Sequence, residues 1–543
     1  MTFPDFEPTM PAFLRVGAQR YGDRTLVVAG GIRCSYTEAE ARSRAVAKGL
    51  LADGVGKGST VGILVPNSVE WAIAFYAATR IGAVAVPINT FFRSRELAWV
   101  LRDADVSYLV SRSDFLGADY LALLESALPG LAEQRADRPL LLPDAPFLRA
   151  VSVWDERQGA WSRGSEGNVV ARGVAAGISD DFLAEVESCI TAADRMVIVY
   201  SSGSTADPKG AIHTHGTVVR HSMNVTDGYK VARDDVMFSS MPFFWVGGLV
   251  TGLLAVQHHG AALVTMDAFE PGAALDLLEQ ERATIALGWP QQGKTMSEHP
   301  TFSDRDLSSI VRTSLPDIVP PERRFPEIHP ESLGMTEACS SHLLGDPYVE
   351  LGEERRGNFG QSVEGLSHKI VDPATGETLP PRAEGEICVR GYSVMQGLQK
   401  REREAVFDSE GWYHTGDAGW RDEDGWYYFT GRLGDMIKTP GGTNVTPAEL
   451  EAVLATYPEV LEAYVVGVPA DGTNEWVAAA VVPRAGESLS DDDVRTRLKG
   501  DVSAYKVPRY VWICAKSDLP FADSGKIQRS ELAARLATRF GDS

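Results

Sequence analysis

Short apolar runs alternate with amphipathic segments along most of the chain. Residues 60–67 (TVGILVPN) form an apolar run that ends in a turn, which predicts a strand, and residues 69–83 follow a helical period. The same alternation predicts a strand at 84–89, a helix at 93–104 and a strand at 106–111. Strands that alternate with helices form parallel sheets joined by crossover helices. The pattern therefore predicts an α/β fold.

The alternation resumes in the middle of the chain. A strand is predicted in RMVIVYSS (195–202), a helix near 216–229, a strand in DVMFSSMP (235–242) and a helix in GGLVTGLLAVQHH (247–259). Residues 115–190 are less regular and rich in Pro, Gly and acidic side chains. We interpret that stretch as surface elaboration of the main domain.

The C-terminal part of the chain has a different pattern. TPAELEAVLATY predicts a helix with Thr446 as its N-cap, and two apolar runs follow. A second helix is capped by Ser490 together with Asp493, and a strand and a last helix complete the segment. Residues 434–543 are therefore predicted to form a small α+β domain, after a large N-terminal domain of residues 1–433.

Composition narrows the classes of function. The 543 residues include 52 Lys and Arg against 74 Asp and Glu, a net charge of -22. Such a surface repels nucleic acids and anionic membranes, so an anionic ligand needs local donors and cations. The N-terminus lacks a signal-peptide pattern, and the apolar stretch at 247–256 is too short to span a bilayer. The five cysteines show no CxxC spacing, which argues against disulfides or zinc and favours the cytoplasm.

The segment YSSGSTADPKG (200–210) directly follows a predicted strand. Its hydroxyls and exposed backbone N–H groups suit phosphate oxygens, and Lys209 adds a positive charge. The pattern GxxxxGK[ST] of nucleotide kinases cannot be fitted to it. A plain glycine–serine turn is the alternative interpretation. The candidate phosphate-binding residues are Ser201, Ser202, Gly203, Ser204, Thr205 and Lys209.

This loop resembles the phosphate-binding signature of the adenylate-forming superfamily, which includes acyl- and aryl-CoA synthetases, luciferases and the adenylation domains of peptide synthetases. Further matches follow in that family's order over about residues 10–535. They are LGMTEA (333–338), GEICVRG (385–391), GWYHTGD (411–417), GRLGDMIK (431–438) and FADSGKIQR (521–529). The resemblance implies an ATP-dependent acid–CoA ligase, which makes an acyl-adenylate and passes the acyl group to coenzyme A, releasing AMP and pyrophosphate.

The resemblance also implies roles in adenylation. Two anions meet when a carboxylate attacks the α-phosphate of ATP, so cations must stand where the negative charge gathers. By resemblance, Lys526 bridges the carboxylate and the phosphate, Thr336 contacts the α-phosphate, and Glu337 holds Mg²⁺. Asp417 accepts both ribose hydroxyls, and Arg432 reaches the ribose. Taken singly, each could instead be an ordinary turn, surface or helix-end residue.

Thioester formation is thought to require rotation of the small domain. By resemblance, Gly434 is the hinge, where glycine supplies backbone freedom. Lys438, Gly441 and Gly442 would line the face that forms the thioester. Two departures bear on the nucleotide: Leu333 stands where the family usually has a tyrosine against adenine, and SLPDIVPP (314–321) stands where relatives carry a Gly–Gly–Ala turn that also supports adenine.

By resemblance, the acyl pocket of the family corresponds to PFFWVGG, to the residues around GWPQQ (288–292) and to Ala338–Cys339 in this sequence. Its candidate residues are Phe244, Trp245, Gly247, Gly248, Trp289 and Cys339. No Lys or Arg lies in PFFWVGG or GWPQQ, so we expect a hydrophobic monocarboxylic acid. Ordinary core packing is the alternative for these aromatic side chains.

Two other functions stay open at this stage. The chain could load the phosphopantetheine arm of a carrier protein, or it could be a degenerate adenylate-binding regulator. The expected partners are the acid, ATP and coenzyme A, with no nucleic acid and no transmembrane segment. Homodimer formation is left open.

Overall fold

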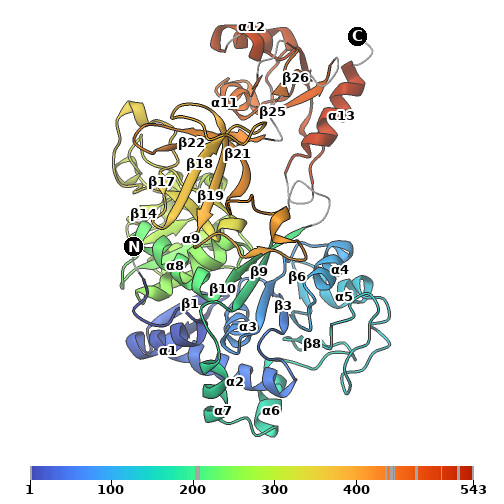
Figure 1. Ribbon diagram of the computed structural model, residues 1–543. Coiled ribbons are helices and arrows are strands. Elements are labelled where there is room, and N and C mark those ends of the chain that lie inside the picture. The colour runs from blue at the N-terminus through green and yellow to red at the C-terminus, as the bar shows by residue number, and fades with distance from the viewer. Residues whose placement is uncertain are drawn as a thin grey trace. The chain divides into compact units, whose positions relative to one another are not determined.

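The computed structural model describes residues 3–201, 208–433, 437–440, 444–445, 447–470, 475–502, 504–522 and 526–540 (Figure 1). The chain forms two compact units. The larger unit contains Met1–Ser367 and Val389–Tyr413, and the smaller unit contains His368–Cys388 and His414–Ser543. The predicted hinge, Gly434, lies outside the described residues, so the boundary between residues 433 and 434 stays a prediction.

A seven-stranded sheet of the larger unit confirms the predicted alternation. Its order is β20-β10-β9-β4-β3-β5-β8, and the five strands from β9 to β8 run parallel. The strands are β3 (Thr60–Leu64), β4 (Val84–Pro87), β5 (Tyr108–Ser111), β8 (Ala150–Val153), β9 (Arg195–Ser201), β10 (Lys209–Thr214) and β20 (Gly397–Leu398). β10 returns antiparallel to β9 and pairs with β20.

A six-stranded sheet lies in the same unit, in the order β14-β13-β11-β12-β1-β2. Its strands are β1 (Thr25–Ala29), β2 (Ile32–Ser35), β11 (Val236–Ser239), β12 (Ala262–Thr265), β13 (Ile285–Leu287) and β14 (Arg312–Thr313). All neighbours pair in parallel except β1 and β2. Parallel neighbours bring their following loops to one edge of the sheet, which decides where the site lies.

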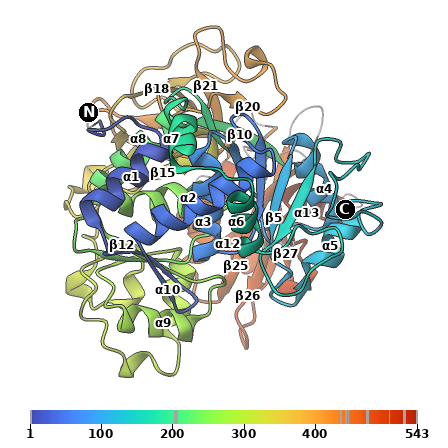
Figure 2. The ribbon, with the colours of Figure 1, turned by 90° about the horizontal axis from the view of Figure 1, so that it is seen from below.

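Helices fill the space between the two sheets and cover their outer faces (Figure 2). α3 (Val69–Arg80) is buried on all sides because its sequence is apolar nearly throughout. The same core layer includes α1 (Met10–Tyr21), α2 (Tyr36–Ala52) and α8 (His215–Gly228). On the outer faces, α4 (Ser94–Asp103) and α5 (Tyr120–Ala127) pack on the seven-stranded sheet, and α9 (Pro271–Gln280) and α10 (Pro290–Ser297) on the six-stranded one.

Two segments of the larger unit differ from the sequence prediction. The helix predicted at 247–259 is a π-helix, η1 (Gly247–Leu254), followed by a short 3₁₀-helix, η2 (Val256–His258). The stretch 115–190 is more regular than predicted. It contributes α6 (Glu166–Ala175), α7 (Asp180–Ser188) and the strand β8, besides α5 and a small hairpin of β6 (Asp114–Phe115) and β7 (Ala118–Asp119).

The smaller unit holds most of a four-stranded sheet and a three-stranded sheet. The first, in order, is β18 (Leu366–Val371), β19 (Gly385–Gly391), β21 (Tyr413–Arg421) and β22 (Tyr427–Arg432), of which β21 and β22 pair antiparallel. The second is β25 (Val460–Pro469), β26 (Glu475–Pro483) and β27 (Tyr510–Ile513), and a hairpin is formed by β23 (Ile437–Lys438) and β24 (Asn444–Val445). α11 (Pro447–Ala455) and α12 (Asp491–Asp501) pack on one face of the three-stranded sheet and α13 (Arg529–Phe540) on the other.

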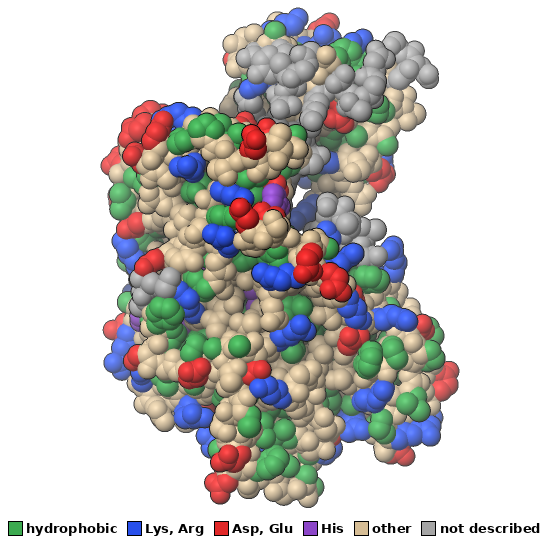
Figure 3. Space-filling model, in the orientation of Figure 1, with side chains coloured by type: hydrophobic (Ala, Val, Ile, Leu, Met, Phe, Trp, Pro, Cys, Tyr) green, Lys and Arg blue, Asp and Glu red, His purple; other side chains and the backbone are tan. Residues whose placement is uncertain are grey.

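The predicted capping box of α12 is confirmed, because Ser490 accepts from the Asp493 N–H and Asp493 accepts in return. The predicted cap Thr446 lies outside the described residues. Within the described ranges, no helix is long and apolar enough to cross a membrane. Acidic and basic side chains are interspersed over the face drawn in Figure 3, so the net charge is not gathered there in one patch.

Candidate active site

The predicted phosphate loop is flanked by a strand pair at the carboxyl end of β9. Ser201, the last residue of β9, lies opposite Lys209, the first residue of β10. Both side chains are half-buried. The two ends of the loop thus meet at the edge of the sheet where parallel α/β folds bind ligands. Ser202, Gly203, Ser204 and Thr205 lie outside the described residues.

Thr336 and Glu337 occupy a tight turn at the tip of a hairpin. The turn (Thr336–Ala338) joins β15 (Leu333–Met335) to β16 (Ser340–Leu344), and β17 (Gln361–Ser362) completes that sheet. The Thr336 carbonyl accepts from the Cys339 N–H at 3.1 Å, and the Met395 N–H donates to the Glu337 carbonyl at 2.7 Å. Both side chains are half-exposed while their backbone is fixed. The turn can therefore present a hydroxyl and a carboxylate without backbone rearrangement.

His213 ties this turn to the strand that carries Lys209. Its Nε2 lies 2.8 Å from the Thr336 carbonyl oxygen, which can only accept, so Nε2 carries the proton. Burial lowers the pKa of His213 to about 4, so the ring is neutral at neutral pH. His213 is not among the site residues predicted from the sequence. It lies in the strand KGAIHT, whose four inner positions are all buried, so no alternation marks it in the sequence.

The aromatic residues predicted for the acyl pocket come together because their loops follow neighbouring strands. β11 and β13 are paired, and the loops after them carry Phe244 with Trp245 and Trp289. Ring centroids lie 5.1 Å apart for Phe244 and Trp245 and 6.1 Å apart for Trp245 and Trp289. Phe91, which was not predicted from the sequence, lies edge-on to Phe244, with the two ring centroids 6.3 Å apart.

This aromatic row is only partly covered by protein. Phe244 is buried, but Trp245 is 37% and Trp289 is 44% exposed. Core tryptophans of this chain such as Trp71 are 0% exposed. Exposed neighbouring indoles form an apolar surface that a ligand could cover.

The loop before the π-helix is held by one buried amide and one glycine. Asn67 donates to the Met241 carbonyl at 2.9 Å and accepts from the Phe243 N–H at 2.8 Å. A Cβ atom on Gly248 would lie 2.2 Å from the Pro242 carbonyl oxygen, closer than any side chain tolerates. Glycine at 248 is therefore required for this loop shape, whereas at Gly247 a Cβ would meet only the Met241 sulfur at 3.1 Å.

Cys339 is fully buried, at 0% exposure within the main core of the larger unit. Burial raises the pKa of its thiol well above the usual range, so the sulfur is protonated at neutral pH. Its backbone has φ +67°, which turns the chain out of the 336–338 turn into β16. Cys339 thus packs the core behind the turn.

In the smaller unit, Asp417 lies within β21, in a strand segment held by hydrogen bonds. The Asp417 N–H donates to Thr415 Oγ1 at 3.0 Å, and Thr415 Oγ1 donates to the Ile387 carbonyl at 2.7 Å. The Gly416 N–H donates to Glu386 Oε1 at 2.9 Å. Asp417 is 3% exposed and lies opposite Arg432 in the strand pair. The side chain of Arg432 lies outside the described residues.

Lys526 is exposed in the same unit, and its carbonyl accepts from the Ala522 N–H at 2.8 Å. The backbone of Lys438 pairs with Asn444 in the hairpin of β23 and β24, but its side chain is not described. Gly441 and Gly442 lie outside the described residues. The roles predicted for Lys526, Lys438, Gly441 and Gly442 stay predictions.

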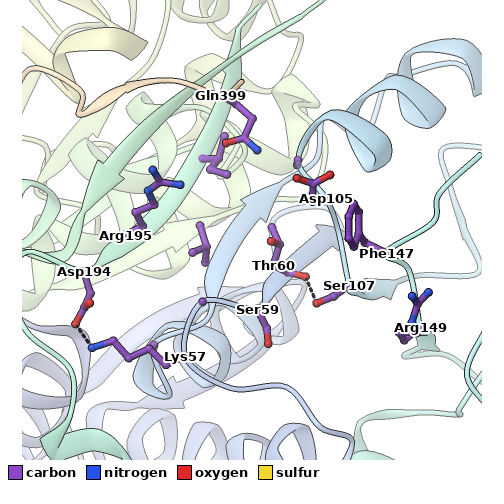
Figure 4. Close-up of a pocket in the computed structure, with 15 residues that line it drawn as sticks. Lys57, Ser59, Thr60, Asp105, Ser107, Phe147, Arg149, Asp194, Arg195 and Gln399 are labelled. Carbon is purple, nitrogen blue, oxygen red and sulfur yellow. Dashed lines mark hydrogen bonds and ion pairs between the residues drawn. The ribbon is translucent and has the colours of Figure 1, made fainter. Parts of the chain in front are cut away.

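A cavity of about 580 Å³ lies at the opposite, amino-terminal edge of the seven-stranded sheet (Figure 4). Three of its charged residues are already ion-paired: Lys57 and Asp194 with each other at 2.7 Å, and Asp105 with Lys400 at 2.8 Å. Ligands of parallel sheets bind at the carboxyl ends of the strands, where the residues described above lie. This cavity is not part of the candidate site.

Comparison with known proteins adds independent information. The model of a family described as AMP-binding enzyme matches residues 14–398, and that of the AMP-binding enzyme C-terminal domain matches residues 449–526. Rice 4-coumarate–CoA ligase 5 is 33% identical over 99% of this chain and 96% of its own length. Rat mitochondrial medium-chain acyl-CoA ligase ACSF2 is 29% identical over 97% of this chain and 87% of its own.

The fold is also found among solved structures. The crystal structure of ATP-bound MatB from Rhodopseudomonas palustris has a TM-score of 0.75 and 25% identity to this chain. The match covers 97% of this chain and 99% of that one. The predicted α/β architecture, with a large N-terminal and a small C-terminal part, is thereby confirmed.

Proposed function

The chain belongs to the family of AMP-binding enzymes, and from that membership we propose that it is an ATP-dependent acid–CoA ligase. It joins a carboxylic acid to coenzyme A through an acyl-adenylate and releases AMP and pyrophosphate. The observation that carries this function is the match to CoA ligases over nearly the whole chain, from the N-terminal domain to the segment with Lys526.

In the first step, a carboxylate oxygen of the acid forms a bond to the α-phosphorus of ATP, and the bond to pyrophosphate breaks. Lys526 stands between the two anions and lowers their repulsion. The Thr336 hydroxyl donates to the α-phosphate. Lys209 and the loop from Ser201 to Thr205 hold the outer phosphates. The pinned backbone at Thr336 supports this assignment, because a fixed donor needs no reorganisation when charge develops.

Glu337 is the residue proposed to hold Mg²⁺. A carboxylate oxygen is the ligand that Mg²⁺ prefers, and Glu337 is half-exposed on a turn fixed by the Met395 N–H. When bound, Mg²⁺ neutralises part of the charge of the triphosphate. Asp417 accepts from the ribose hydroxyls, and Arg432 lies next to it on β22.

In the second step, the sulfur of coenzyme A attacks the acyl carbon, the bond to AMP breaks and the thiol proton leaves. We propose that Gly434 is the hinge of a domain rotation that exchanges Lys526 for Lys438, Gly441 and Gly442 at the reacting acyl group. The cytoplasm is the proposed compartment.

The proposed acid is a hydrophobic monocarboxylic acid. The row of Phe91, Phe244, Trp245 and Trp289 offers an apolar surface, and the segments 240–248 and 288–292 contain no Lys or Arg to pair a second carboxylate. The printed names of two relatives, a medium-chain acyl-CoA ligase and a 4-coumarate–CoA ligase, suit this class.

The test is a screen for pyrophosphate release across matched acids. Hexanoate, decanoate, benzoate and 4-coumarate represent the proposed class; succinate, malonate and glycine represent dianions and an amino acid. AMP is measured with and without coenzyme A. We expect turnover only with members of the first set, and AMP release that depends on coenzyme A. Pyrophosphate release without coenzyme A-dependent AMP release would indicate a carrier-protein acceptor. No turnover with any acid would contradict the ligase function, and preference for a dianion would overturn the substrate class alone.

A further inference from the structure

Glu386, Cys388 and His414 form a compact cluster of three different donors in the smaller unit. Glu386 and Cys388 alternate along β19, so their side chains lie on the same face of the sheet, and His414 comes from the neighbouring strand β21. One donor atom from each lies within 4.8 Å of the other two. His414 Nδ1 is 2.6 Å from Glu386 Oε2 and 3.5 Å from Cys388 Sγ.

The donor set has the chemistry of a zinc site. Zn²⁺ binds thiolate, imidazole and carboxylate together, at about 2.3, 2.0 and 2.1 Å. Tetrahedral angles then separate nitrogen from sulfur by about 3.5 Å and nitrogen from oxygen by about 3.4 Å. The observed separation of His414 and Cys388 already has the first value. The carboxylate oxygen of Glu386 needs to withdraw by roughly 0.8 Å, a movement that small torsions of a Glu side chain supply.

A hydrogen bond from a neighbouring backbone group orients one of the three side chains, as in known metal sites. The second oxygen of Glu386 accepts from the Gly416 N–H at 2.9 Å, which fixes the carboxylate with its other oxygen toward His414. Glu386 and Cys388 are buried, whereas the His414 side chain is 38% exposed and gives an ion a route from solvent. Three protein ligands leave a fourth position for water.

We propose that Glu386, Cys388 and His414 bind one zinc ion or another divalent cation with affinity for sulfur. Binding displaces the thiol proton of Cys388 to solvent, and His414 ligates through Nδ1 as a neutral imidazole that carries its proton on Nε2. The same Glu386 accepts from the N–H of Gly416, the residue before Asp417 in β21. Occupancy of the cluster is therefore coupled to the backbone position of residues 416–417.

The test uses the full chain, freed of metal with a chelator and kept reduced, without ATP, acid or coenzyme A. The probe is Co²⁺, because a thiolate ligand gives cobalt a charge-transfer absorption that carboxylates and imidazoles do not. We expect this absorption to saturate at one equivalent and to disappear when Zn²⁺ is added. His414→Asn and Glu386→Gln should weaken binding by about 10–100-fold, and Cys388→Ala should abolish the absorption. Cys189→Ala, at an exposed cysteine, is the matched control and should behave as the unchanged protein.

Any of three results would overturn the proposal. The unchanged protein could show no thiolate absorption, the absorption could survive Cys388→Ala, or it could be unaffected by His414→Asn. Near-ultraviolet circular dichroism of each variant shows whether it is folded. His414→Asn changes a partly exposed side chain and keeps the test valid if Cys388→Ala does not fold. Because no substrate is present, failure here says nothing against the ligase function.

Discussion

Lowering the pH should destabilise the larger unit through three buried histidines. His213, His215 and His221 are 0% exposed on the connected elements β10 and α8. Burial lowers the pKa of His213 and His215 to about 4 and that of His221 to about 3. An unfolded histidine takes up its proton near pH 6.5. Between these values the unfolded chain binds protons that the folded chain does not.

These three histidines favour the folded state at high pH and disfavour it at low pH. Stability rises with pH wherever the unfolded state binds more protons, so it is fully present above pH 6.5 and is lost as the pH falls toward 4. Each histidine contributes about 1.4 kcal/mol per pH unit inside that window, or about 2 kcal/mol between pH 7.5 and pH 5. Three histidines contribute about 6 kcal/mol, which is comparable to the whole stability of a typical domain.

Amide hydrogen exchange of the segment 211–225 measures this loss locally, after correction for the intrinsic rate at each pH. The protection of the unchanged protein should fall by about four orders of magnitude between pH 7.5 and pH 5. His215→Asn keeps an acceptor for the Met10 N–H and removes one titrating ring. Its protection should fall by about 30-fold less over the same interval.

His259→Asn, at a ring that is 37% exposed, is the control and should follow the unchanged protein. Carboxyl groups whose pKa is lowered, such as Asp194, lose their contribution only below about pH 4 and do not enter this window. An equal loss of protection in His215→Asn and in the unchanged protein would refute the assignment to buried histidines.

Two further variants address the proposed function. Lys526→Ala should abolish pyrophosphate release while thioester formation from supplied acyl-adenylate persists; Lys516→Ala, in an exposed ion pair of the same unit, is the control. Equal adenylation by both variants would remove Lys526 from the mechanism. Gly248→Ala should lower kcat/KM for the acid by at least about 10-fold, because its Cβ collides with the Pro242 carbonyl and must move the loop of Phe244. Gly397→Ala, where a Cβ has open space, should be neutral, and a neutral Gly248→Ala would contradict this view of the loop.

The alternating pattern predicted the first half of the fold because its signals are local. The run at 60–67 became β3, and the segment at 69–83 became α3, which begins after Ser68 and ends at Arg80. Both are recognised from periodicity and a capping residue alone. The order of the strands in the sheet is not local, and the sequence did not predict it.

In the stretch 115–190, local sequence signals did not predict the structure. Its Pro and Gly content suggested irregular structure, yet α6 packs closely on α2. A Cβ on Gly173 would lie 2.7 Å from the Gly49 backbone nitrogen, so this glycine is needed for the approach of two helices and does not mark a turn. The same limit applies to the cluster of Glu386, Cys388 and His414. The absence of CxxC argued against zinc, because spacing describes one segment and the cluster joins two strands.

In the candidate site, the motif residues that would meet the ligand differ from the residues that hold their backbone in place. Three predicted groups lie in or beside a backbone segment that a partner distant in sequence fixes: His213 holds the turn of Glu337, Asn67 the loop of Trp245, and Glu386 the strand segment before Asp417. The sequence assigned no role to these three partners, because a motif is recognised by the group that meets the ligand. A partner acts only through the position of that group, so it is defined by the fold. Substituting one of these partners should therefore displace the reacting groups without removing them. A displacement of about 1 Å can lower a rate by two orders of magnitude.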